Sequence, residues 1–65
     1  MNILLNQQPL ALPEGASLAD ALAQQALLPP YAVAVNTLFV PRTQYAAKAL
    51  QEGDRVEVVS PVTGG

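Results

Sequence analysis

A chain of 65 residues with neither cysteine nor histidine must hold its fold together by packing alone. Disulfides and zinc sites, which support many very small domains, need those two residue types. A domain of about 60 residues buries only ~60% of the surface that its unfolded chain exposes. The apolar content of 51% still favours a folded chain over a disordered one. We therefore expect one small domain with a compact core, and no chemistry that needs a thiolate or an imidazole.

The charge pattern argues against two classes of partner. Three basic residues against five acidic ones give a net charge of −2, and no cluster of Lys and Arg exists to neutralise phosphates. The longest apolar run, residues 31–35, is far shorter than the ~20 residues that cross a bilayer. No basic residue precedes Arg42, so the start of the chain lacks the basic segment of a signal peptide. We expect a cytoplasmic protein that binds neither nucleic acid nor membrane.

The start of the chain predicts a β-hairpin. Residues 2–6 place Ile3 and Leu5 on one face, as in a strand. Residues 7–8, both Gln, are expected to form the turn. Residues 9–13 then return as a second strand, and the prolines at both its ends suit an edge strand because proline cannot donate to a ladder.

The next segment predicts a helix over residues 18–26. Ser17 and Asp20 have the spacing of a capping box, in which each side chain accepts a hydrogen bond from the other residue's backbone N–H. Pro29 and Pro30 must stop the helix, because the residue before a proline is pushed out of the α region. The apolar stripe expected to face the core comprises Leu18, Ala21, Leu22 and Ala26.

A second hairpin is predicted after the prolines. Residues 31–36 form its first strand, with Val33 and Val35 on one face. Residues 38–40 form a short return strand that Pro41 closes.

The last third predicts a short helix and a final strand. Residues 45–50 can form one or two helical turns, with Thr43 as a possible cap. After a turn, residues 55–59 alternate clearly, with Val56 and Val58 inward.

This order of elements predicts an α+β fold. One sheet with one helix across its face is the economical way to close a small core. A hairpin, a helix and a further strand require a crossover, which is right-handed in ~98% of parallel cases. We expect a ubiquitin-like β-grasp, a mixed sheet of about five strands with one main helix packed across it and a short second helix. The last strand should lie centrally beside the first, with its inward valines against Leu18 and Leu22.

Few side chains remain that could carry chemistry. Glu52, Asp54 and Glu57 are close in sequence, and a pair of catalytic carboxylates can be imagined among them. Such a pair needs a desolvated cleft that so short a chain can hardly build, so solvated turn and surface positions are favoured. Lys48 is expected to be an exposed surface residue.

The end of the chain, Thr63, Gly64 and Gly65, is the remaining feature. Two terminal glycines arise by chance in about one chain in 200, and a frayed terminus is the alternative to a functional one. Glycines lack a Cβ and can thread a narrow channel, so residues 62–65 could carry the Gly65 α-carboxylate over ~10 Å from the body. A carboxylate is a poor electrophile until it is activated, for example as an acyl-adenylate. The chain has no phosphate-binding glycine loop, so a partner enzyme would have to perform that activation.

Taken together, these segments resemble the ThiS family, the sulfur carriers of thiamine thiazole synthesis. The likeness lies in LPEGASLADAL (residues 12–22), in VAVN (33–36) with FVPR (39–42), and in GDRVEVV (53–59) followed by the glycine end. One departure is Thr37 and Leu38 after Asn36, where the family often has Gly. This difference puts the type of that turn in doubt.

The resemblance implies a protein that performs no catalysis and binds no cofactor. Family members are adenylated at the C-terminal glycine by an E1-like adenylating enzyme that consumes ATP. The adenylate is exchanged for a thiocarboxylate with sulfur from a donor such as a cysteine desulfurase, and the thiocarboxylate then supplies thiazole synthase. Carried over to this chain, Gly65 would be modified, while Gly64 and Thr63 would thread into the partner. Residues 1–60 would be the β-grasp domain and 61–65 a flexible Gly-Gly tail.

A partner surface is expected near that tail. Leu4, Val59 and Val62 either have the wrong parity for the core or lie beyond it, and exposed apolar patches usually mark interfaces. Three alternatives to the thiazole carrier stay open: a related carrier for molybdopterin synthesis, a ubiquitin-like protein modifier, and an inert β-grasp interaction domain.

Overall fold

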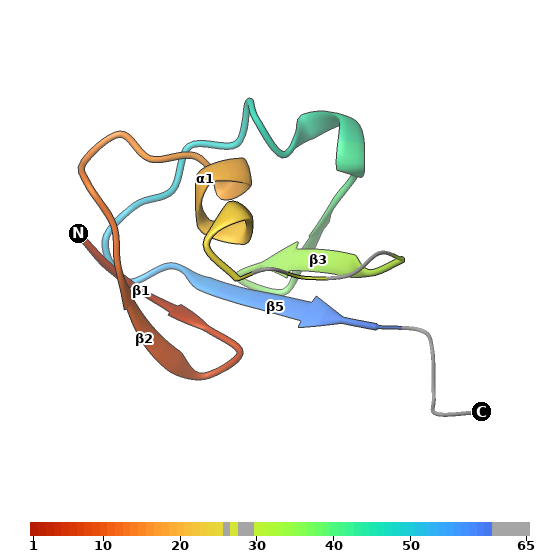
Figure 1. Ribbon diagram of the computed structural model, residues 1–65, viewed down its shortest axis with the longest axis horizontal. Coiled ribbons are helices and arrows are strands. Elements are labelled where there is room, and N and C mark those ends of the chain that lie inside the picture. Colours follow the sequence, from red (N-terminus) through yellow and green to blue (C-terminus); the bar gives the residue numbers. More distant parts are fainter. Residues whose placement is uncertain (26, 28–29, 61–65) are drawn as a thin grey trace.

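The computed structural model describes residues 1–25, 27 and 30–60. Within these residues the elements are β1 (Asn2–Leu5), β2 (Gln8–Ala11), α1 (Leu18–Ala23), β3 (Ala32–Val35), β4 (Leu38–Val40), the 3-10 helix η1 (Arg42–Gln44) and β5 (Arg55–Val59). The strands form one sheet in the order β2-β1-β5-β3-β4 (Figure 1). Strand β1 is parallel to β5, and the other neighbouring pairs are antiparallel.

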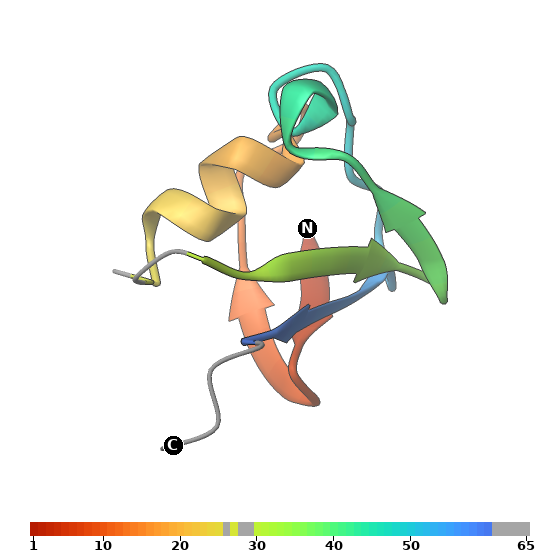
Figure 2. The same cartoon turned by 90° about the vertical axis from the view of Figure 1, so that its right-hand side faces the viewer.

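The arrangement confirms the predicted β-grasp. The last strand, β5, lies in the centre of the sheet beside β1, as expected. Both α1 and η1 lie on one side of the sheet, here called the inner face, and the opposite or outer face carries no helix in the described part of the chain (Figure 2). The inner face therefore builds the core, and the outer face is left for other roles.

The core consists of small and branched apolar side chains. Of the residues predicted to point inward from β5, Val56 is buried and Val58 is half-buried against the core. The buried residues are Ile3, Leu5, Leu12, Ala16, Leu18, Ala21, Leu22, Val33, Val35, Val40, Leu50 and Val56. Strand periodicity therefore identified the inward residues correctly.

Two tight turns close the hairpins. The β1–β2 loop consists of Asn6 and Gln7, with φ angles of 51° and 69°, because Leu5 pairs directly with Gln8. Positive φ at both positions is the signature of a type I′ turn, which matches the twist of the strands. The prediction that residues 7–8 form the turn was wrong by one residue. Asn tolerates the left-handed conformation better than most residues, which explains why Asn6 opens the turn.

The capping box at the start of α1 is confirmed. The Ser17 hydroxyl accepts from the Asp20 N–H at 3.2 Å, and the Asp20 carboxylate accepts from the Ser17 N–H at 2.9 Å. The helix is shorter than predicted, since the Gln24 N–H already bonds to the carbonyl of Ala21 three residues back. Such a tightened last turn is a common helix end. Ala26, the predicted end, lies outside the described residues.

The second helix does not lie where the sequence predicted it. The structure has a single 3-10 turn, η1, among its described residues, and residues 45–50 form no helix. Thr43 is not its cap. The N-cap is Pro41, which makes no side-chain capping bond and whose fixed φ of −67° leads into the turn.

Long-range backbone bonds explain why residues 45–50 stay irregular. The Leu50 N–H donates to the Ala16 carbonyl at 3.0 Å, and the Lys48 carbonyl accepts from the Leu18 N–H at 2.8 Å. These backbone groups are therefore committed to the chain around the start of α1, and the buried Leu50 side chain fills the core there.

Candidate functional site

The outer face of the sheet carries side chains that the core does not use. Because side chains alternate along a strand, the burial of Val56 places Arg55, Glu57 and Val59 on the outer face. The register of the sheet shows which residues of neighbouring strands lie beside them on the same face. These neighbours are Leu4 beside Arg55, Ala34 beside Glu57, Ala32 beside Val59, and Phe39 beside Ala34.

One half of this face is an apolar groove. Phe39 and Val59 are 68% and 62% exposed, and both belong to the lining of a groove that also contains Ala32 and Ala34. The small alanines leave room between the two larger side chains. Exposed apolar side chains gathered in this way are typical of an interaction surface. We call these four residues the apolar groove; the buried Val33 and the exposed Glu57 also contribute to its lining.

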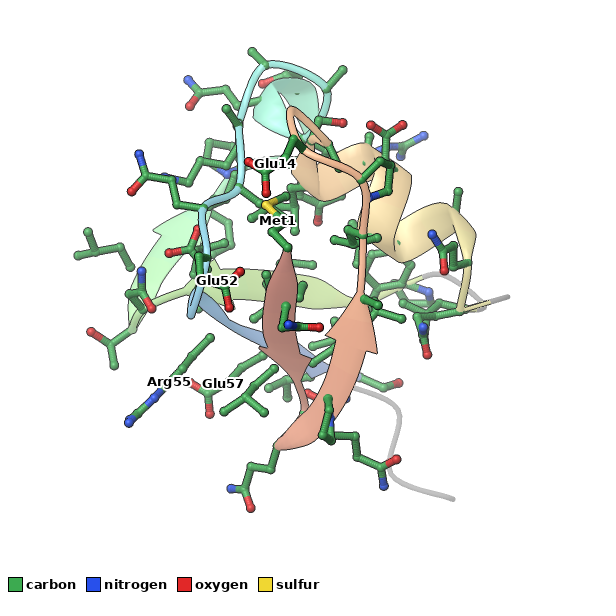
Figure 3. All side chains as sticks on the ribbon, turned by 90° about the vertical axis from the view of Figure 1, so that its left-hand side faces the viewer. Met1, Glu14, Glu52, Arg55 and Glu57 are labelled. Atoms are coloured by element: carbon green, nitrogen blue, oxygen red, sulfur yellow. The ribbon has the colours of Figure 1, made fainter. Side chains whose placement is uncertain are left out.

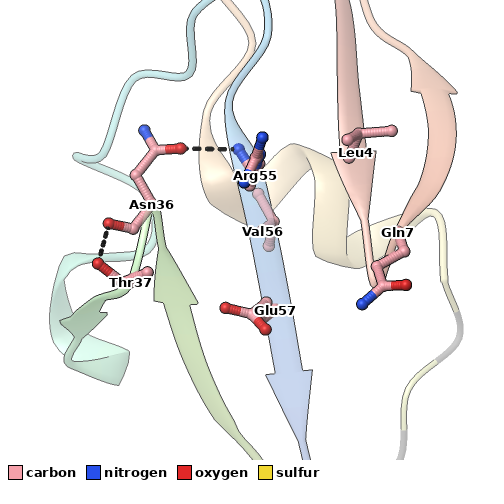
Figure 4. Close-up of a pocket in the computed structure, with 7 residues that line it drawn as sticks. All are labelled: Leu4, Gln7, Asn36, Thr37, Arg55, Val56 and Glu57. Carbon is pink, nitrogen blue, oxygen red and sulfur yellow. Dashed lines mark hydrogen bonds between the residues drawn. The ribbon is translucent and has the colours of Figure 1, made fainter.

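The other half of the outer face is polar. The half-buried Leu4 lines a pocket there together with the charged Arg55 and Glu57 (Figure 4). These two charged side chains project from the same side of β5 (Figure 3). A partner that covers the apolar groove therefore meets one positive and one negative group next to it.

The structure brings two of the predicted partner-binding residues onto this face. Val59 is exposed, as predicted, and Leu4 is half-buried on the same side of the sheet. Val62 and residues 63–65 lie outside the described residues. Sequence reasoning missed Phe39, because its face follows from the register seen in the structure: Val40 pairs with the buried Val33, which puts Phe39 on the opposite side.

The three acidic residues near the end of the chain form no catalytic pair. The Glu52 carboxylate accepts from the Asn2 N–H at 2.9 Å, and Asp54 accepts from the Gln51 N–H at 2.8 Å. Glu57 is exposed on the outer face. Among the described residues, no three acidic side chains come together. Both carboxylates therefore accept backbone hydrogen bonds, Glu52 from the distant Asn2 and Asp54 from within its own turn.

An aromatic pair lies on the helix side of the molecule. The rings of Tyr31 and Tyr45 stack at 6.3 Å between centroids, with 8° between their planes. Burial raises the pKa of Tyr45, the neighbouring Tyr31 adds to that rise, and Arg42 opposes it. Sequence analysis had not singled out this pair, and it lines a different surface from the outer face.

Among the helices in the described part of the chain, none has the length and apolar character that a membrane crossing requires.

Comparison with known proteins gives two findings. A model of the ThiS family matches residues 3–65. The crystal structure of a thiamine biosynthesis protein, ThiS, from Geobacter metallireducens aligns with a TM-score of 0.82. That alignment covers 100% of both chains at 23% sequence identity, and at this identity it establishes the likeness of fold. No curated protein sequence gives a significant match.

Proposed function

Because the chain belongs to the ThiS family, we propose that it is a sulfur carrier of thiamine biosynthesis and that its partners supply the catalysis. The observation that carries this proposal is the reach of the family match, which extends through residue 65 and so includes both terminal glycines. The absence of cysteine and histidine is consistent with it, because a carrier needs no nucleophile or base of its own.

The working group is the α-carboxylate of Gly65. An E1-like adenylating enzyme joins a carboxylate oxygen to the α-phosphorus of ATP, and pyrophosphate leaves. The terminal sulfur of a persulfide, supplied by a donor such as a cysteine desulfurase, then attacks the acyl carbon, and AMP leaves with the bridging oxygen. A second thiol, from a partner protein, attacks the donor's sulfur in the resulting acyl disulfide; this releases the thiocarboxylate and leaves a disulfide on the partner. The product is a thiocarboxylate on Gly65. Its anionic sulfur is the nucleophile delivered to thiazole synthase, and the tether keeps its local concentration high.

The sequence at this end suits such a transfer. Six residues, 60–65, follow the last residue of β5, and an extended chain of that length spans at most ~20 Å. Gly64 and Gly65 add no side chains, and Thr63 is the nearest bulky residue. A partner channel sized for glycine would admit the carboxylate and exclude larger residues.

The outer face is where the adenylating enzyme and thiazole synthase would dock. Val59 ends β5 and lies in the apolar groove, so a protein that covers the groove is close to the start of the tail. Burial of exposed Phe39 and Val59 would contribute binding energy, while Arg55 and Glu57 would favour partners with complementary charges.

The chemistry is tested by mass. Incubation with the adenylating enzyme, ATP and a sulfur donor should raise the mass of the chain by the difference between sulfur and oxygen. Fragmentation should place the change at Gly65, and omission of ATP should abolish it. A modification that mapped to Lys48 or Tyr45 would contradict the proposal.

Docking is tested by two matched charge insertions. Val59→Asp puts a carboxylate into the apolar groove and should weaken binding to the adenylating enzyme by about tenfold or more. Leu38→Asp is the control. Leu38 is 71% exposed but lies on β4 opposite the inward Val35, so it faces away from the groove. Titration calorimetry should show a loss of affinity for the adenylating enzyme in Val59→Asp only. Equal losses of affinity in both variants would exclude the outer face as the docking site.

A further inference from the structure

Two asparagine side chains hold the central strand at its two ends. The Val58 N–H donates to the Asn6 side-chain oxygen at 2.8 Å. The Arg55 N–H donates to the Asn36 side-chain oxygen at 2.9 Å, and Figure 4 shows this second bond. Both asparagines have a φ of 51° and open the two-residue turn of a hairpin. The two bonds therefore attach both hairpin turns of the sheet to β5.

The Asn6 bond replaces a ladder bond that β1 can no longer supply. Strand β1 ends at Leu5, and the last backbone bond to β5 runs from the Asn6 N–H to the Val56 carbonyl at 2.8 Å. The next group on that side of β5 is the Val58 N–H, but the chain has turned away at Asn6. The side-chain amide accepts the bond instead, and it extends the pairing of β5 by one step.

This extension matters because Val58 is the last residue but one of the strand. On the other side, β3 pairs with Val58 and Val59. With the Asn6 bond, the end of β5 is held from both sides up to the residue before Val59. Without it, the side of that end facing β1 would lose this bond, and the Val58 N–H would lose its acceptor.

From this geometry we infer that Asn6 is a positioning residue for sulfur transfer: it fixes the end of β5, and with it the place and direction from which the Gly-Gly end leaves the domain. This inference rests on the proposed function. Asn6 touches no reacting atom, and it acts through Val58. In a chain without the bond, the end of β5 must become ordered when the adenylating enzyme binds. This ordering costs free energy and weakens the affinity.

The test compares Asn6→Gly with Asn36→Gly. Glycine accepts a φ of 51° without strain, so each variant keeps its turn. Asn6→Gly loses the acceptor of the Val58 N–H, whereas Asn36→Gly loses the acceptor of the Arg55 N–H and also the bond that the Asn36 amide donates to Asp54 at 3.0 Å. Loss of one such bond is expected to raise the KM of the adenylating enzyme for the Asn6→Gly carrier about three- to tenfold, with kcat nearly unchanged. The Asn36→Gly carrier is altered at the far end of β5, beside Arg55 in the outer-face pocket, and its KM should rise less than that of the Asn6→Gly carrier. Asn6→Asp restores an acceptor and should restore the KM.

Amide hydrogen exchange gives a readout that does not depend on sulfur chemistry. Asn6→Gly should accelerate exchange at Val58 and leave Val56 protected, whereas Asn36→Gly should accelerate exchange at Arg55. Equal KM values for Asn6→Gly and the wild type, or equal rises in both glycine variants, would overturn the positioning role while the carrier function stands. A wild-type chain that accepts no sulfur would overturn both.

Discussion

Thr37 has the backbone conformation least suited to its side chain. It occupies the second position of the β3–β4 turn with a φ of 71°, a region that β-branched residues rarely adopt. Its hydroxyl donates to the Asn36 carbonyl, which offsets part of the strain. The doubt about this turn is thereby resolved: a two-residue loop with both φ angles positive forms here without glycine.

Replacing Thr37 with glycine should stabilise the domain. Relief of the left-handed strain outweighs the extra flexibility of glycine in the unfolded chain, for a net gain of about 0.5–1 kcal/mol. For a domain this small, the melting temperature should rise by roughly 3–7 °C. Thermal melts followed by circular dichroism measure the change. A lower melting temperature would show that the hydroxyl bond is worth more than the strain.

At the scale of elements, α1 depends heavily on its first turn. The helix has only six residues, and helices of that length are not stable in water on their own. Its start is fixed by the capping box and by the Leu18 N–H, which donates to the Lys48 carbonyl. The rest of the helix is stabilised by packing of Leu18, Ala21 and Leu22 in the core.

Removal of the Ser17 hydroxyl should therefore lower the free energy of unfolding. Ser17→Ala leaves the Asp20 N–H without its acceptor and is expected to lower the free energy of unfolding by about 1 kcal/mol. Ser17→Thr keeps a hydroxyl and should lose only a few tenths of that amount. Urea denaturation of the three proteins gives the comparison, and equal stability of the Ala and Thr variants would exclude a role for the hydroxyl.

Elements set by local pattern were predictable from sequence, and those set by distant contacts were not. Alternation identified Val33, Val35 and Val56 as inward, because one face of each strand must meet the core. The segment after Pro41 follows distant backbone bonds, such as that between Leu50 and Ala16, which leave no trace in local periodicity. The bond from Val58 to Asn6 joins residues 52 positions apart and was equally invisible.

At the scale of the whole molecule, the core and the candidate site lie on opposite faces of one sheet. The four residues that define the apolar groove lie outside the buried core, and the core residue Val33 also contributes to the groove lining. The glycine end was predicted from its two terminal glycines, and the family resemblance then implied its role, whereas Phe39 was found on the outer face only through the register of β4 against β3. Stability and sulfur transfer should therefore respond to different substitutions.

Two variants separate these properties. Deletion of Gly64 and Gly65 removes no apolar side chain, so the free energy of unfolding should change by less than about 0.5 kcal/mol. Sulfur acceptance should nevertheless vanish, because the deletion shortens the reach and moves the carboxylate onto β-branched Thr63. A deletion variant that melted much lower, or that still accepted sulfur, would contradict the assignment of the working group to Gly65.

Leu22→Ala should lower the stability of the domain and leave the chemistry of the glycine end intact. Leu22 is 6% exposed and packs in the core, so its truncation should cost ~2–5 kcal/mol through lost burial and a cavity. A domain of this size has a total stability of only ~3–5 kcal/mol, so the variant should be partly or wholly unfolded at about 37 °C. Its glycine end is chemically intact, and sulfur acceptance should therefore recover on cooling in proportion to the folded fraction measured by circular dichroism. Acceptance that stayed absent in a refolded sample would mean that the core residue also shapes the docking face, and the separation of the two faces would fail.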